Sequence, residues 1–330
     1  MAEYAHLSKP SEEWLEYASK SSPPVLNGSP VELRQMLSIM KKNMNEKTEM
    51  PTDELESGAI TIPSRADHRI PVRWYAPKGK SNLPVVVLFH GGGFVMGDLE
   101  NEEVSSRFIA RDCAALVFNV EYRLAPEHPF PAGLEDAYDA VRWVATNANE
   151  LLGSPETGFV VGGFSAGSSF ATVCAQLARD EGLQPPITGQ LLSLPSTLHH
   201  SVYPEKWRSE LLSYQQNSNA PVINAKSIEI FEPLYACPDW ADPWASPALH
   251  PNLEDLPKAY FQITGLDPLR DEGFLYARLL RENGAKTKVD VYPGLPHTFW
   301  TFPGLKSSKK WIQDTIAGVL WLLDGDEVRL

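Results

Sequence analysis

The chain contains 330 residues, of which 43% are hydrophobic and 22% are charged, and this ordinary composition excludes disordered, collagen-like and fibrous proteins. Its formal net charge of −13 and its pI of about 5.1 argue against a nucleic-acid partner, because an acidic surface repels phosphate. Its three cysteines have no metal-ligand spacing and do not indicate a disulfide framework, so we expect neither a bound metal nor disulfide bridges.

Residues 1–57 are predicted to form a helical segment that caps the body of the chain. Ser11 is a suitable N-cap for a first helix, and Trp14 lies on the apolar face of that helix. The stretch VELRQMLSIMKKNM then repeats apolar residues at helical spacing. The repeated positions are Leu33, Met36, Leu37, Met40 and Met44.

The charged residues at the end of this stretch do not form a basic patch. Lys41 and Lys42 are followed by Glu46 and Glu49, which indicates a solvated helix face. The first residues, MAEYAHLSKPSEEW, lack the basic region and the apolar run of a secretory signal, and no apolar run reaches the length of a membrane span. We therefore expect a cytoplasmic protein without stable membrane association.

From residue 58 the sequence changes to alternating strand and helix patterns. Strands are indicated by AITIPS, by HRIPVRWYAP and by the wholly apolar PVVVLFH, which is typical of a buried central strand. Helical patterns near 103–112, 133–147 and 166–179 alternate with further strands, which predicts a mostly parallel sheet with helices on both faces. Residues 197–250 break the alternation with prolines, histidines and tryptophans, and we expect an insertion there that completes the cap.

The heptapeptide GFSAGSS at 163–169 follows an apolar strand and precedes a run of good helix formers. This context is typical of the G-x-S-x-G turn, in which the glycines let the backbone pass closely and the serine side chain is exposed. The motif alone also occurs as an ordinary turn of small residues. A catalytic role for Ser165 therefore requires a histidine base and an orienting carboxylate elsewhere in the chain.

Both partners occur after later strands of the expected sheet. GLDPLRDEG places Asp267 just past the strand KAYFQIT, and GLPHTFW places His297 just past the strand TKVDVYP. An open α/β sheet keeps its active site at these carboxyl ends of the strands. The order serine, aspartate, histidine is that of an α/β-hydrolase. Asp271, close behind Asp267, is an alternative orienting acid.

The residues His-Gly-Gly-Gly at 90–93 supply a candidate oxyanion hole. Because Gly91, Gly92 and Gly93 carry no side chains, backbone amides of this loop can approach the oxygen of a substrate carbonyl. The amide of Ala166, at the start of the helix that follows Ser165, adds another donor. The chain thus contains the parts of a serine hydrolase in the expected order.

These motifs resemble those of the hormone-sensitive lipase family of α/β-hydrolase esterases, also called the HGGG or bacterial family IV group. The resemblance extends from about residue 58 to the C-terminus and implies that 58–330 form an α/β-hydrolase catalytic domain with a cap insertion at about 197–250. The carrying motifs are HGGGF at 90–94, YRLAPEHPFPAGLEDA at 122–137, GFSAG at 163–167, SPALHPNLEDLPKAYFQITGLDPLRDEG at 246–273 and GLPHTF at 294–299.

The resemblance also implies roles for individual residues, and it favours Asp267 over Asp271 as the orienting acid. The implied catalytic triad is Ser165, Asp267 and His297. The implied oxyanion hole consists of the amides of Gly92, Gly93 and Ala166, supported by the loop residues His90 and Gly91. In this family the histidine of the loop shapes the glycine turn and does not transfer protons, and the reaction requires no metal or organic cofactor.

Two positions depart from the family pattern. Phe164 stands where the family usually has aspartate or threonine, and Ser168 stands where it usually has glycine. Phe164 places a bulky apolar group beside the nucleophile, which we expect to reshape the pocket. If the cap covers the site, large apolar side chains are predicted to line it. These are Phe94, Phe164, Trp14, Met36, Met40 and Trp207.

Two further pairs of polar residues are interpreted as structural. Glu127 and His128 lie between prolines, and the family resemblance favours a structural corner. His199 and His200 are neighbours in sequence, so we expect their side chains to point in different directions, and the sequence indicates no third metal ligand. Both histidines are predicted to be solvated residues of the cap.

The leading hypothesis is a serine carboxylic ester hydrolase (EC 3.1.1) that acts on small, short-acyl esters through an acyl-enzyme. One alternative is an acyl-transferring, thioester-cleaving or lactone-cleaving hydrolase dedicated to a secondary-metabolite pathway. Another is a non-catalytic small-molecule receptor on the same fold, like the plant gibberellin receptors of this family, which lack the histidine present here as His297. The expected partner is a small-molecule ester, and the sequence leaves open whether the protein forms a homodimer.

Overall fold

A single mixed sheet of eight strands forms the centre of the computed structural model, which describes residues 3–45, 48–65, 67–302 and 304–324. The strand order is β1-β2-β4-β3-β5-β6-β7-β8. β2 runs antiparallel to both of its neighbours, and every pairing from β4 to β8 is parallel. The strands are β1 (Leu55–Pro63), β2 (Arg69–Pro77), β3 (Val85–Phe89), β4 (Leu116–Val120), β5 (Phe159–Phe164), β6 (Gly189–Ser193), β7 (Lys258–Leu266) and β8 (Thr287–Pro296).

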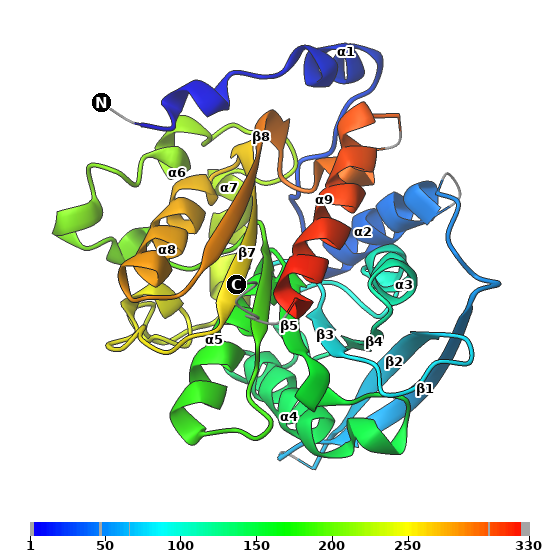
Figure 1. Cartoon of the computed structure of the whole chain (residues 1–330). Coiled ribbons are helices and arrows are strands. Elements are labelled where there is room, and N and C mark those ends of the chain that lie inside the picture. The colour runs from blue at the N-terminus through cyan, green and yellow to red at the C-terminus, as the bar shows by residue number, and fades with distance from the viewer. Residues whose placement is uncertain (1–2, 46–47, 66, 303, 325–330) are drawn as a thin grey trace, which may run out of the picture.

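Helices cover both faces of this sheet, as the sequence predicted (Figure 1). The helices α3 (Glu103–Asp112) and α9 (Lys306–Leu323) pack on one face. The other face is covered by α4 (Ala132–Asn147), α5 (Ala166–Glu181) and α8 (Arg270–Glu282). The prediction of an α/β fold with a mostly parallel sheet is therefore confirmed.

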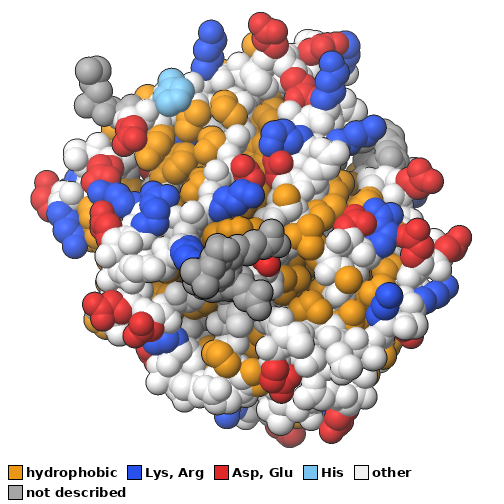
Figure 2. Space-filling model, in the orientation of Figure 1, with side chains coloured by type: hydrophobic (Ala, Val, Ile, Leu, Met, Phe, Trp, Pro, Cys, Tyr) orange, Lys and Arg blue, Asp and Glu red, His pale blue; other side chains and the backbone are white. Residues whose placement is uncertain are grey.

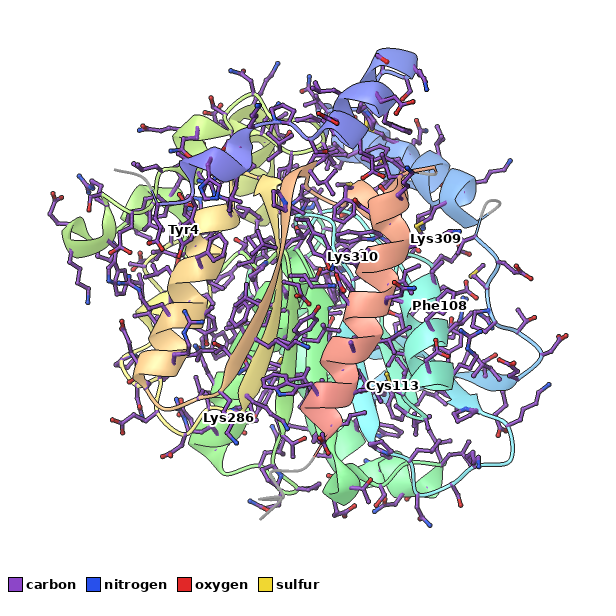
Figure 3. All side chains as sticks on the ribbon, turned by 45° about the horizontal axis from the view of Figure 1, so that its top comes forward. Tyr4, Phe108, Cys113, Lys286, Lys309 and Lys310 are labelled. Carbon is purple, nitrogen blue, oxygen red and sulfur yellow. The ribbon has the colours of Figure 1, made fainter. Side chains whose placement is uncertain are left out.

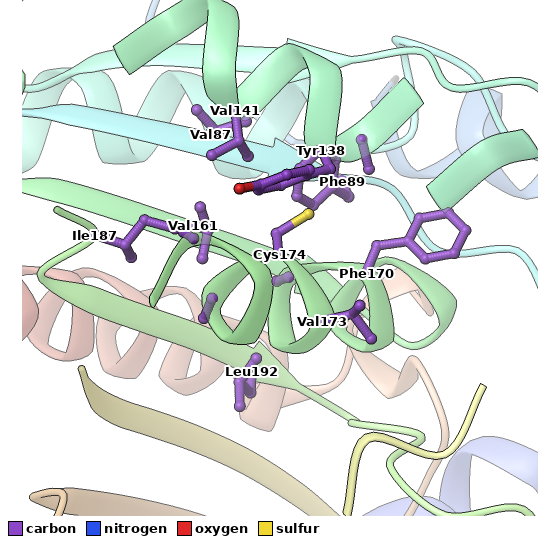
Figure 4. Packing of buried hydrophobic residues seen from close by; sticks show 14 of the residues in the cluster. Val87, Phe89, Tyr138, Val141, Val161, Phe170, Val173, Cys174, Ile187 and Leu192 are labelled. Carbon is purple, nitrogen blue, oxygen red and sulfur yellow. The ribbon is translucent and has the colours of Figure 1, made fainter. Parts of the chain in front are cut away.

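The fully apolar strand β3 is explained by these two layers. Val87 and Phe89 belong to the hydrophobic cluster under α4 and α5, where Figure 4 shows them close to Cys174 and Tyr138. Val86 and Leu88 point to the opposite cluster, under α3 and α9. Because both faces of a central parallel strand are buried, no position on it can be polar without cost.

Two segments lie across the carboxyl ends of the parallel strands. The N-terminal segment contains α1 (Glu12–Lys20) and α2 (Pro30–Asn45). The segment between β6 and β7 contains α6 (Ser213–Gln216), α7 (Ala225–Tyr235) and several short 3₁₀ turns. We call them the N-terminal cap and the inserted cap. Figure 3 brings this end of the molecule forward and shows Tyr4 above α8, where its ring stacks on Phe274 at 3.9 Å.

The two cap segments are joined by a short parallel β-bridge between Val25 and Val222. The amide of Leu26 donates to the carbonyl of Val222 at 2.8 Å, and the amide of Val222 donates to the carbonyl of Pro24 at 3.0 Å. Segments that are far apart in sequence are thus tied together above the sheet.

Side chains of α2 tie the N-terminal cap to the body. Arg34 donates to the backbone carbonyls of Val95 and Ala125 and makes a bidentate ion pair with Glu127 at 2.8 and 2.6 Å. Glu127 is therefore an anchor of the cap, which agrees with its predicted structural role.

The prediction of a solvated helix face at the end of α2 is wrong for Lys41. Its side chain is only 8% exposed, and its ammonium group pairs with the carboxylate of Asp98. The carboxylate of Glu100 lies 3.8 Å away. Glu46, which contributed to that prediction, lies outside the described residues.

The described surface mixes charges of both signs. Figure 2 shows acidic and basic side chains interspersed with apolar ones over the visible face. No helix within the described ranges is long and apolar enough to cross a bilayer.

Candidate active site

Ser165 occupies a strained turn between β5 and α5. Its φ and ψ are 52° and −120°, a conformation that L-residues rarely adopt and that is found where a function requires it. The turn is tight because Gly167 has no side chain; a Cβ there would lie 2.0 Å from the carbonyl oxygen of Phe89. The amide of Ser165 donates to the carbonyl of Ser193 on β6 at 2.8 Å, which fixes the turn to the sheet.

Three side chains from distant parts of the sequence meet at this turn. Nε2 of His297 lies 2.9 Å from Oγ of Ser165, and Nδ1 of His297 lies 2.7 Å from Oδ2 of Asp267. All three residues are buried, with exposed fractions of 7% or less. The arrangement has the geometry of a nucleophile, a base and an orienting acid.

The carboxylate of Asp267 is itself held in place. The hydroxyl of Thr264 donates to Oδ2 at 3.0 Å, and the amide of Leu269 donates to Oδ1 at 2.9 Å. Asn217, from the inserted cap, donates to the backbone carbonyl of Asp267 at 2.9 Å. The acid therefore has a fixed orientation toward the imidazole.

Asp271, the alternative orienting acid, has a different position. Its Oδ2 accepts hydrogen bonds from the amides of Leu212 and Ser213, and its Oδ1 accepts from Arg270 at 2.8 Å. Its carboxylate therefore holds the inserted cap to α8. Of the two acids, Asp267 makes the contact with His297.

The glycine loop lies beside Ser165. Gly92 has a φ of 132°, and a Cβ at this position would lie 2.0 Å from the carbonyl oxygen of Met96, so only glycine fits. Within the described residues, the amides of Gly92 and Gly93 donate no hydrogen bond, and no side chain caps the start of α5 at Ala166. These three N–H groups have the chemistry of an oxyanion hole.

His90 supports this loop from below. Its ring stacks on Tyr122 at 4.1 Å, and its Nδ1 donates to the carbonyl of Gly91 at 2.8 Å. Burial lowers the pKa of His90 to about 4, so the ring is neutral near pH 7. These contacts agree with a loop-shaping role.

A buried carboxyl group lies behind the same loop. Glu102 is 7% exposed, and its Oε1 lies 3.5 Å from the amide of Gly91. Burial without a cationic partner raises the pKa of Glu102 to about 8. This carboxyl is therefore protonated near neutral pH.

Two cavities open on the two sides of Ser165. Their volumes, including the solvent at their openings, are about 630 and 770 Å³. We call them the inserted-cap cavity and the N-cap cavity. The inserted-cap cavity is lined by, among others, Phe94, Ala166, Tyr203, Tyr214, Phe231 and Trp240. The N-cap cavity is lined by, among others, Leu37, Met40, Gly92, Phe164, His297 and Trp300.

The predicted pocket residues divide into two groups. Phe94, Phe164 and Met40 line these cavities. Phe164 is almost fully buried against Trp300 and Trp311, so its position beside the nucleophile is wholly apolar.

The remaining three predicted residues are not among the described residues that line either cavity. Trp14 packs against Tyr17 and Phe302 in the core of the cap. Met36 packs on the cluster under α3 and α9, and Trp207 packs on the opposite cluster. Trp14 is buried, whereas Met36 and Trp207 are only partly buried.

The expectation that His199 and His200 point in different directions is wrong. Their ring centroids are 4.4 Å apart, and both rings approach the carboxylate of Glu232 on α7, with N–O distances of 2.8 and 3.5 Å. The ligand atoms of the three residues lie within 4.8 Å of one another. All three residues line the inserted-cap cavity, so they are not simply solvated.

Several supporting residues have no clear signal in the sequence. Contacts with the triad or the glycine loop are made by Thr264, Asn217 and Glu102. These contacts become visible only in the folded structure. For Glu102 a weak indication is its place just before α3, whose first turn buries Val104 and Ser105.

Comparisons with known proteins agree with this geometry. A family model described as alpha/beta hydrolase fold matches residues 86–301. The versiconal hemiacetal acetate esterase of Dothistroma septosporum is 31% identical over 317 residues, which cover 95% of this chain and 95% of that protein. Esterase LipI of Mycobacterium tuberculosis is 43% identical over 229 residues, 68% of each chain. A solved structure of vibralactone cyclase is 32% identical and covers 96% of both chains, with a TM-score of 0.92.

Proposed function

Because this chain belongs to the hormone-sensitive lipase family of α/β-hydrolases and is a carboxylic ester hydrolase, we propose that it cleaves small esters through an acyl-enzyme on Ser165. The observation that carries the proposal is the continuous hydrogen-bonded series from Ser165 through His297 to Asp267. The receptor alternative is disfavoured, since a binding protein has no need of a positioned base.

In the first half-reaction, Oγ of Ser165 attacks the ester carbonyl while Nε2 of His297 accepts its proton. The negative oxygen of the tetrahedral intermediate accepts hydrogen bonds from the amides of Gly92, Gly93 and Ala166. The C–O bond to the alcohol then breaks, and His297 returns the proton to the alcohol oxygen. In the second half-reaction, water replaces Ser165 as the nucleophile and the same steps release the acid.

The position of His297 also indicates which half of the ester each cavity binds. His297 must reach the oxygen of the leaving alcohol, and its ring lines the N-cap cavity. The alcohol half therefore lies under α2, and the acyl half extends into the inserted-cap cavity. Both cavities are lined mainly by apolar side chains, which supports esters whose acyl and alcohol parts are apolar.

The test is a series of p-nitrophenyl esters from acetate to laurate, with Ser165→Ala measured in parallel. We expect kcat/KM to be highest for short acyl groups and to fall by about 10⁴-fold or more in the variant. Retained activity in Ser165→Ala would contradict the acyl-enzyme, and a rate that rises steadily toward laurate would contradict the short-acyl preference.

A second candidate function is transfer of the acyl group to a hydroxyl of the same substrate, which would release a lactone in place of an acid. It is favoured by the likeness, over 96% of both chains, to a structure named as a cyclase. Mass spectrometry of products formed in H₂¹⁸O separates the two functions. Hydrolysis places one ¹⁸O atom in the released acid, whereas cyclisation gives a lactone without label.

A further inference from the structure

The inserted-cap cavity is apolar and aromatic over most of its wall, but one part of the wall is polar. This part is the histidine cluster, which we define as His199, His200 and Glu232. The cluster lines the same cavity as Ser165, although the catalytic steps described above do not use it. All three side chains are partly buried, and polar groups in the wall of an otherwise apolar cavity can fix the orientation of a ligand.

The protonation of His199 follows from its contacts. Its Nδ1 lies 2.7 Å from Oγ of Ser201 and accepts from the amide of Ser201 at 3.3 Å. Since a backbone amide can only donate, Nδ1 carries a lone pair and the proton resides on Nε2. Nε2 then donates to Oε1 of Glu232 at 2.8 Å, and the ring is fixed by stacking on Trp240 at 3.9 Å.

His200, in contrast, has ring nitrogens without a hydrogen bond from the described residues. It stacks on Tyr214 at 4.0 Å, but its Nδ1 lies 3.5 Å from Oε1 of Glu232, and no described residue makes a hydrogen bond with the ring. Burial and the neighbouring His199 lower the pKa of His200, which favours the neutral ring. A neutral imidazole whose Nδ1–H faces Glu232 leaves a lone pair on Nε2.

The free groups of the cluster are therefore acceptors. Besides the lone pair of His200, the second oxygen of Glu232 accepts no hydrogen bond from the described residues. The carboxylate of Glu232 disfavours an anionic ligand at this place. A metal ion is also disfavoured. A neutral His199 that bound a metal through Nε2 would carry its proton on Nδ1, where it would face the amide N–H of Ser201.

We propose that the histidine cluster binds a hydroxyl group on the acyl half of the substrate, so that the enzyme prefers esters of hydroxylated acids with a flat, apolar body. This inference rests on the proposed ester hydrolysis, because it names the substrate class of the same site. The hydroxyl donates to Glu232 or His200, and the apolar body contacts the surrounding aromatic side chains, which include Phe94, Tyr235 and Trp240.

The experiment compares p-nitrophenyl esters of three matched acids, 4-hydroxyphenylacetic, 4-methylphenylacetic and 4-methoxyphenylacetic acid, and of the corresponding 3-phenylpropanoic acids. The methyl group has nearly the size of the hydroxyl, and the methoxy group accepts but does not donate. We expect kcat/KM of the wild-type enzyme to be about tenfold higher for the hydroxyl ester than for either partner in at least one series.

The variants are His200→Phe, which keeps a ring for stacking on Tyr214, and Glu232→Gln, which removes the charge. Both should bring the hydroxyl-to-methyl ratio of kcat/KM close to one, mainly by lowering kcat/KM for the hydroxyl ester. The matched control is His250→Phe, since His250 also pairs with a carboxylate, that of Asp180, but lies outside this cavity. It should keep the wild-type ratio.

Three results would overturn the inference. One is a wild-type ratio below twofold in both series, and another is an unchanged ratio in both cluster variants. The third is activity that responds to Zn²⁺ or EDTA and loses this response in His200→Phe, which would identify a metal site.

Failure of ester hydrolysis itself is detected separately. Binding of methyl 4-hydroxyphenylacetate and methyl 4-methylphenylacetate to the Ser165→Ala protein is measured by calorimetry, with and without His200→Phe. A preference of about tenfold for the hydroxyl ester that disappears in the double variant supports the cluster even if no ester is turned over. Equal binding of both esters speaks against it.

Discussion

The orienting acid shows how single residues set the chemistry of the site. Asp267 uses one carboxylate oxygen for both His297 and Thr264 and the other for the amide of Leu269. A carboxylate fixed in this way keeps the proton of the neutral imidazole on Nδ1, so that Nε2 presents its lone pair to Ser165.

Asp267→Asn should therefore lower kcat by about 10⁴-fold with little loss of stability, because the amide can place its NH₂ group against Nδ1 and so favour the wrong tautomer. Steady-state kinetics and thermal unfolding measure the two effects. Asp271→Asn is the comparison, and it should lose stability through the cap contacts of Leu212 and Ser213. A kinetic loss in this variant as large as that of Asp267→Asn would contradict the assignment.

Glu102 links the glycine loop to the pH dependence of stability. Its pKa in the folded protein is about 8, compared with 4.5 for an exposed glutamate. The folded state thus holds a proton that the unfolded state releases above about pH 4.5. The contribution of this group is fully present below that pH and is lost as the pH rises through 8.

Glu102→Gln should become more stable relative to the wild type as the pH rises from 4.5 to 8, by at most about 1.4 kcal/mol for each pH unit. Urea unfolding at several pH values measures the difference. Glu150→Gln, at an exposed position, should follow the wild type throughout. A difference between Glu102→Gln and the wild type that does not vary with pH would show that the carboxyl is ionised in the folded state.

At the scale of elements, the attachment of α2 decides the shape of the N-cap cavity. The guanidinium of Arg34 reaches two backbone carbonyls and a carboxylate at once, and Glu127 has a pKa lowered to about 2 by this contact. The single ammonium group of a lysine cannot make hydrogen bonds to these three partners at the positions that the guanidinium reaches.

Arg34→Lys should destabilise the protein by about 1 kcal/mol and raise KM more than it lowers kcat, since α2 lines the cavity without touching the reacting atoms. Thermal unfolding and p-nitrophenyl acetate kinetics measure both. Arg208→Lys is the control, because Arg208 forms an exposed pair with Glu205. Identical behaviour of the two variants would mean that the anchor of α2 lies elsewhere.

The sequence predicted those elements whose pattern is local. The buried strands, the helices on both faces and the G-x-S-x-G turn have signals within a few residues, and the structure has them close to the expected bounds. The sequence could not predict the contacts that depend on where the backbone of the two cap segments runs. Lys41 finds Asp98, and His199 finds Glu232, only because segments distant in sequence are brought together, and no spacing rule describes such a meeting.

At the scale of the whole molecule, the sheet and the caps differ in how their backbone is held. The strands β3 and β5 are buried along their whole length, whereas the inserted cap consists of short helices and turns. Local opening is least costly where few buried contacts and little regular hydrogen bonding exist.

Hydrogen exchange measured by mass spectrometry should therefore be at least about tenfold faster in α2, α6 and α7 than in β3 and β5, which should exchange only through global unfolding. Because the Val25–Val222 bridge joins the caps, Arg34→Lys should accelerate exchange in the inserted cap as well as in α2. Acceleration confined to α2 would show that the two caps open independently.

The same bridge bears on how such an enzyme can change its substrate over evolutionary time. The two segments that meet at Val25 and Val222 are encoded far apart, on either side of the sequence for the central strands. Recombination between related genes could exchange one of these cap segments and leave the other unchanged. The backbone of the exchanged segment would then have to form the β-bridge with a segment from a different parent. Functional chimaeras should therefore inherit both segments from one parent, and the catalytic sheet from either.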